Sequence, residues 1–227
     1  MSSDNIFERL FKLWTSVCKL VLDGKRDPKL IATILQGIVD ESAPATALAE
    51  PTEKFALFVD LGIITVPDDY DHETQLAKFK ERHQDGKKKS FCFYNDNITH
   101  DNFPKPTRIL KPGDKLRVRA FQQVVGGKIT SEERMAFLAT QKAVHTGAQG
   151  ASLVFEQKRD QLPKGKWYAS FDEKDRLWAD ADGDLRVSYV YCHSDGGFGF
   201  DLGYLEGIWF GDRAFLCFTE VEETKVI

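Results

Sequence analysis

The sequence predicts an α+β protein in which an N-terminal helical hairpin precedes a mixed domain with a largely antiparallel C-terminal sheet. Three observations predict this class. Apolar residues recur with helical spacing through residues 6–41. A helix-capping signal, followed by a run of good helix formers, begins at Thr130. From Leu185 onward, apolar and polar residues alternate with the period of a half-buried strand.

The composition fits a globular chain and argues against several other classes of protein. Of 227 residues, 42% are hydrophobic and 29% are charged, which suits one sizeable domain with a small appendage. The net charge of −4 provides no basic face for phosphates, so we expect no nucleic acid partner. We also expect no membrane span and a cytoplasmic protein, since the chain has no long apolar run and no basic signal segment.

Two amphipathic helices are predicted at the N-terminus. The first covers Ile6 to Leu22, and the second begins with Asp27 as its N-cap, Pro28 at its first position, and runs to about Glu41. A hairpin of this size is too small to form its own core. We therefore expect residues 1–41 to pack on the rest of the chain, on a second copy or on a protein partner.

The predicted domain order is a hairpin over residues 1–41, an Ala/Pro-rich linker over 42–53, an α+β domain over 54–222 and a tail over 223–227. The elements expected in the first part of the α+β domain are a bent strand from Phe55 to Val66, a helix capped by Asp71 and ending near Gln84, a strand from Lys89 to Tyr94, an irregular loop over 95–107, and a strand from Lys115 to Val125.

The centre of the chain carries the clearest local signal. Thr130 and Glu133 have the spacing of a capping box, and the helix is expected to reach Thr146, with Gly147 ending it. We expect a buried strand at 151–157 and its return partner at 166–171. The strands predicted beyond them form an antiparallel meander, at 185–191, 198–203 and 214–219.

Two segments together resemble stretches of an uncharacterised bacterial protein family. They are Gly24-Lys25-Arg26-Asp27-Pro28, and the run from Gly147-Ala148-Gln149-Gly150 through Lys164-Gly165-Lys166-Trp167-Tyr168. The resemblance covers most of the chain and implies a bacterial origin, with the same helical hairpin ahead of an α+β domain. It implies no activity, so no functional residue is carried over.

The end of the chain resembles the closing strands of C-type-lectin-like domains, in Asp195-Gly196-Gly197-Phe198 through Phe215-Leu216-Cys217-Phe218. The paired cysteines and the tryptophan signature of that fold are missing. The four cysteines form no CxxC pair and are expected to be free thiols, although Cys192 and Cys217 could pair in an oxidising compartment.

The best candidate metal ligands are Asp180, Asp182 and Asp184, because alternate carboxylates in a tight loop can converge on Ca²⁺. The loop departs from an EF-hand, with Leu185 where glycine is needed and Tyr191 where a bidentate Glu belongs. An acidic turn before the next strand is the favoured interpretation.

The best acid–base candidates are His100 with Asp101 in a polar loop, and His193 at a hairpin tip. A turn or surface role is favoured for them, because catalysis also needs a nucleophile and a pocket. His72 and His83 are too far apart on their helix to share a metal. Residues 147–150 are not expected to hold phosphate, since they follow a predicted helix and precede a predicted strand.

Aromatic residues supply the candidates for ligand or partner contact, namely Trp14, Trp167, Trp178 and Trp209. Rings that point outward from a sheet can form a binding platform, although burial in the core is favoured for most.

The sequence does not identify an activity. We expect a non-catalytic binding or assembly protein that uses its hairpin or an aromatic sheet face, without a cofactor unless Ca²⁺ binds. The alternatives are a small hydrolase with a His/Asp site and a calcium-stabilised, lectin-like ligand-binding domain.

Overall fold

The computed structural model describes residues 14–16, 18–19, 21–23, 27–29, 31, 54–85, 90–207, 209 and 213–221. The chain divides into two compact units, Met1–Thr52 and Glu53–Ile227. In the first unit, Asp27 Oδ1 accepts the Lys29 N–H at 2.8 Å, a contact expected of an N-cap. Most of the predicted hairpin, the linker and the tail lie outside the described residues.

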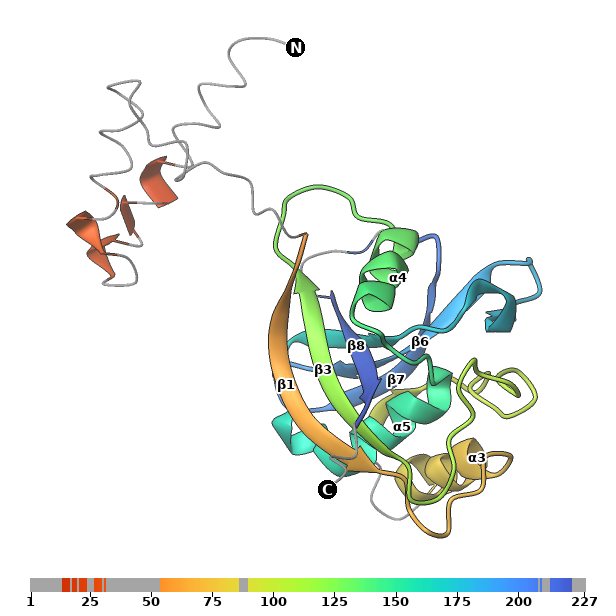
Figure 1. The fold of residues 1–227 in the computed structure, drawn as a ribbon. Helices are drawn as coiled ribbons and strands as arrows, with labels where there is room; N and C mark the ends of the chain where they lie inside the picture. The colour runs from red at the N-terminus through yellow and green to blue at the C-terminus, as the bar shows by residue number, and fades with distance from the viewer. Residues whose placement is uncertain are drawn as a thin grey trace, which may run out of the picture. The chain divides into compact units, whose positions relative to one another are not determined.

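The second unit is built on one eight-stranded mixed sheet with few helices, and this corrects the predicted fold class. No helical hairpin is shown, and the sheet is not confined to the C-terminal part, since β1 and β3 belong to it (Figure 1). The elements are β1 Phe55–Thr65, α3 Gln75–Lys80, the π-helical turn η1 Glu81–Asp85, β2 Phe91–Tyr94, β3 Lys115–Gln123, α4 Ser131–Thr140, α5 Gly147–Lys158, η2 Arg159–Gln161, β4 Lys166–Ser170, η3 Lys174–Arg176, β5 Trp178–Ala179, β6 Leu185–Cys192, β7 Phe198–Tyr204 and β8 Arg213–Glu220.

The strand order is β1-β3-β8-β4-β6-β7-β2, with β5 paired to β6. Two pairs are parallel, β4 with β8 and β2 with β7, and the others are antiparallel. The predicted meander therefore fails at its last step, because β8 lies between β3 and β4 and does not pair with β7. β1 is bent by two register shifts on either side of Val59, as expected for a strand broken by polar and glycine residues.

The capping box at Thr130 is confirmed. Its side chain accepts the Glu133 N–H while the Glu133 carboxylate accepts the Thr130 N–H. The helix ends at Thr140, short of the predicted Thr146. Lys142 has a positive φ of 54°, so the chain reverses soon after the helix ends.

The segment predicted as a strand at 151–157 is instead part of helix α5. Gly147, with a φ of 55°, is the first residue of α5 and does not end a helix. All residues of α5 from Gly147 to Phe155 are buried, so the helix has no polar stripe to reveal a helical period. A short apolar run of this kind cannot be assigned to strand or helix from periodicity alone.

Each face of the sheet carries its own core. Neighbouring strand residues alternate between the two, as Phe215 and Cys217 face one side while Leu216 and Phe218 face the other. Helices α3 and α5 cover the first face through Leu76, Phe79 and Phe155, and α4 contributes Leu138 to the second. Within the described part of the chain, no helix has the length and apolar content needed to cross a membrane.

Candidate active site

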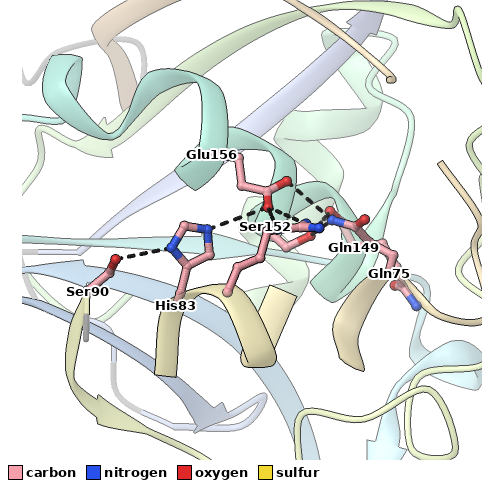
Figure 2. Close-up of polar contacts among 7 residues, drawn as sticks. Gln75, His83, Ser90, Gln149, Ser152 and Glu156 are labelled. Carbon is pink, nitrogen blue, oxygen red and sulfur yellow. Dashed lines mark hydrogen bonds and ion pairs between the residues drawn. The ribbon is translucent and has the colours of Figure 1, made fainter. Parts of the chain in front are cut away.

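A serine, a histidine and a carboxylate from distant segments meet beside helix α5 (Figure 2). His83 comes from the π-helical turn that follows α3, and Ser90 lies immediately before β2. Glu156 is near the C-terminal end of α5. Figure 2 shows the imidazole of His83 between the other two side chains.

The imidazole has a polar partner at each of its ring nitrogens. Ser90 Oγ lies 3.1 Å from His83 Nδ1, and Glu156 Oε1 lies 3.5 Å from His83 Nε2. Since a carboxylate can only accept, we assign the ring proton to Nε2, which leaves Nδ1 to accept the Ser90 hydroxyl proton. The backbone reinforces this geometry, because the Ser90 N–H donates to the His83 carbonyl at 2.8 Å.

Other polar groups hold the Glu156 carboxylate in place. The Arg82 guanidinium donates to Oε1 through Nε at 2.9 Å and also through Nη2. On the opposite side, Gln75 Nε2 lies 3.5 Å from Oε2 and donates to Ser152 Oγ at 3.0 Å. These contacts restrict the carboxylate to one position against the imidazole.

Aromatic rings fix the plane of the imidazole. The ring centroid of His83 lies 4.8 Å from that of Phe79, 5.2 Å from Phe155 and 6.1 Å from Phe91. The histidine also lies in a π-helical turn, a distortion that is frequent at functional sites. The histidine side chain keeps 15% of its surface exposed.

Burial is the main reason that the pKa of His83 is lowered from its ordinary value of 6.5, although the Glu156 carboxylate opposes the shift. The imidazole is therefore neutral at neutral pH and can accept a proton. A neutral imidazole between a hydroxyl and a fixed carboxylate can act as a general base for that hydroxyl.

The histidines predicted for catalysis lie elsewhere. The ring of His100 lies 5.8 Å from that of His72, and the neighbouring Asp101 is exposed. His193 Nε2 lies 3.2 Å from the sulfur of Cys92, which the sequence interpretation did not connect with it. Among the described residues, His100 packs against His72 and His193 contacts Cys92, so the structure does not bring His100, Asp101 and His193 together.

The acidic loop uses its first carboxylate in protein contacts. Asp180 accepts the N–H groups of Asp182 and Asp184, each at 3.0 Å, and pairs with the Arg186 guanidinium. That pairing lowers the pKa of Asp180. Within the described residues, no group of three or more His, Cys, Asp or Glu side chains is placed to hold a metal ion. Calcium binding by this loop stays a prediction.

The four candidate tryptophans have different environments. Trp14 is 49% exposed in the first unit, and Trp178 is partly buried against Phe103. Trp209 is buried and donates to Ser131 Oγ at 2.8 Å. Trp167 is half-buried and belongs to a row of rings on the second face of the sheet, with centroids 4.4 Å from Tyr189 and 4.6 Å from Tyr191.

The sequence excludes phosphate at residues 147–150 only if a helix precedes them and a strand follows. That order is wrong, because these residues begin helix α5. A Cβ atom at Gly147 would lie 3.0 Å from the Asp172 carboxylate, so an acidic group already occupies the space beside this helix end. Burial raises the pKa of Asp172, which nevertheless accepts hydrogen bonds from Thr107 and Glu173. A carboxylate in this position excludes a phosphate.

The sequence interpretation missed Ser90, Glu156 and the role of His83. Their spacing matches no short catalytic motif. Arg82, the residue next to His83, is 74 positions away from Glu156 in the sequence. Residues 147–158 form a helix, which the sequence pattern did not predict. This helix places Glu156 on the side that faces His83. Comparisons with protein-family models, with curated proteins and with solved structures found no match for this chain.

Proposed function

We propose that this protein is a hydrolase that cleaves small acyl esters with Ser90 as its nucleophile. The observation that carries the proposal is the contact series of Ser90 Oγ, His83 and Glu156, with separations of 3.1 Å and 3.5 Å. The arrangement corresponds to a nucleophile, a base and the group that orients the base. The sequence alone favours a non-catalytic binding protein that uses its hairpin or an aromatic sheet face, with a small hydrolase as the alternative. This cluster is the reason for proposing an enzyme.

In the first step, Ser90 Oγ attacks the carbonyl carbon of the ester while its proton passes to His83 Nδ1. The imidazolium is stabilised by Glu156 and gives the proton to the departing alcohol. A water molecule then attacks the acyl-serine, again losing a proton to Nδ1, and the acid leaves as Ser90 recovers its proton. The net reaction converts an ester and water into an acid and an alcohol.

The test uses the full chain with a series of 4-nitrophenyl esters of increasing acyl length. Ser90→Ala and His83→Gln should each lower kcat/KM by at least about 100-fold, the lower range for a general base. His72→Gln is the matched control, because His72 lies between the Tyr70 hydroxyl and the Pro104 carbonyl and, among the described residues, has no hydrogen bond or ion pair to a serine or carboxylate. It should keep activity within about threefold.

Covalent labelling provides an independent measurement. A fluorophosphonate should add one phosphonyl group to Ser90, detected by peptide mass mapping, and His83→Gln should slow that addition. Full esterase activity in Ser90→Ala, or absence of hydrolysis across the ester series, would show that the cluster only joins η1 and β2 to α5.

The described cysteines, Cys18, Cys92, Cys192 and Cys217, are free thiols. A cytoplasmic location stays a prediction. A protein partner or second copy that contacts residues 1–41 stays a prediction.

A further inference from the structure

A second pair of reactive groups lies on the other face of the sheet from the Ser90 cluster. Cys92 is in the edge strand β2, and its side chain is exposed. His193 directly follows β6 in the turn that leads to β7. The sulfur lies 3.2 Å from His193 Nε2, and the Cys92 S–H also has the Phe198 carbonyl oxygen as an acceptor at 3.0 Å.

The turn and a neighbouring ring hold the imidazole against the sulfur. The His193 N–H donates to the Gly197 carbonyl at 2.8 Å, and the Gly196 N–H returns to the His193 carbonyl at 3.1 Å. The centroid of the Tyr191 ring lies 4.2 Å from that of His193, with the planes at 71°. The imidazole is therefore ordered by contacts that do not involve Cys92.

Glycines leave the sulfur accessible. A Cβ atom at Gly197 would stand 3.9 Å from Cys92 Sγ, and one at Gly199 would stand 3.9 Å from His193 Nε2. Because neither residue has a side chain, the space in front of the thiol and the imidazole stays open. The charged groups nearest this turn are Asp195, which accepts the Gly197 N–H at 2.9 Å, and Lys164, which comes from the loop before β4 and lies against Gly196.

We propose that Cys92 is a nucleophilic thiol that forms mixed disulfides with low-molecular-weight disulfides, with His193 as the acceptor of its proton. The imidazole takes the S–H proton, and the resulting thiolate attacks one sulfur of the disulfide. A new S–S bond forms as the old one breaks, and the second half leaves as a thiolate that takes up a proton. The disulfide is reduced, and Cys92 is oxidised to the mixed disulfide.

The other cysteines serve as internal references. Cys192 and Cys217 are buried, and burial raises the pKa of both thiols. They should therefore react only when the fold opens. Cys18, which is half-buried in the first unit, reports the reactivity of a thiol outside the sheet.

The experiment treats the full chain with oxidised glutathione at pH 6, 7 and 8 and follows each cysteine by peptide mass mapping. At pH 6, Cys92 should gain glutathione at least about tenfold faster than Cys18, because the imidazole stabilises the thiolate. Equal rates for Cys92 and Cys18 in the wild-type chain would overturn the proposal without any variant.

Two variants separate the pair from simple exposure. His193→Gln should slow the reaction of Cys92 about tenfold at pH 6 and far less at pH 8, where more of a thiol ionises unaided. Cys92→Ser should remove the fast reaction. If Cys92 reacts as fast in His193→Gln as in the wild type at every pH, the imidazole has no role in the reaction. Ser90→Ala should leave Cys92 reactivity unaltered, so this inference is tested independently of ester hydrolysis.

Discussion

The packing of α5 on the sheet predicts a large difference between two phenylalanine-to-alanine substitutions. Phe155 has no exposed surface, and its ring centroid lies 4.5 Å from Phe91, 5.1 Å from Phe198, 5.2 Å from His83 and 5.7 Å from Phe79. Removing a ring from such a site loses its transfer energy and leaves a cavity, at a cost of about 3–5 kcal/mol. For a chain of this size, that corresponds to a fall in Tm of about 6–20 °C.

The matched control is Phe93→Ala, since Phe93 lies in the neighbouring strand β2 and is 51% exposed. Its loss should change the free energy of unfolding by no more than about 0.5 kcal/mol.

Urea denaturation followed by tryptophan fluorescence measures both variants. The transition of Phe155→Ala should shift to lower urea with an unchanged slope. If the free energies of unfolding of the two variants agree within about 1 kcal/mol, the packing of α5 against β2 and α3 described here is wrong.

Three further predictions follow from individual groups. Burial lowers the pKa of His83 in the folded state, so the unfolded chain binds more protons below pH 6.5, and stability is lost as the pH falls through this window. Urea denaturation at pH 7, 6 and 5 should show a smaller loss of stability in His83→Gln than in the wild type. Equal losses would contradict the assignment of this pH dependence to His83. Gly150→Ala places a Cβ 1.8 Å from Thr146 Oγ1 and 2.7 Å from its Cβ, so the free energy of unfolding should fall by about 1–3 kcal/mol. Thermal melts measure this change, and Gly126→Ala, with open space around it, is the control. Burial raises the pKa of Asp172 above 3.8, so its charge at pH 7 costs stability that returns as the pH falls toward that value. Asp172→Asn should be at least as stable as the wild type at pH 7, and this advantage should shrink at pH 4.5. If Asp172→Asn loses more than about 1 kcal/mol of stability at pH 7, the charge itself is needed.

The sequence by itself determined the features that depend on neighbouring residues. The capping box of α4 needs only Thr130 and Glu133, three positions apart, so its spacing is visible in the chain. The bend of β1 and the turn between β6 and β7 likewise arise from local polar and glycine residues. In each case, the interaction closes within a few residues, and tertiary packing does not reverse it.

Only the tertiary structure decided that 147–158 is a helix, that β8 lies between β3 and β4, and that His83 meets Ser90 and Glu156. A fully buried segment shows the same apolar run as a helix or as a strand, so the contacts on all its sides choose between them. The position of β8 depends on pairing with strands far away in the chain, which no local pattern encodes. Because the candidate site needs α5 beside η1 and the start of β2, its residues come together only when these distant segments are assembled.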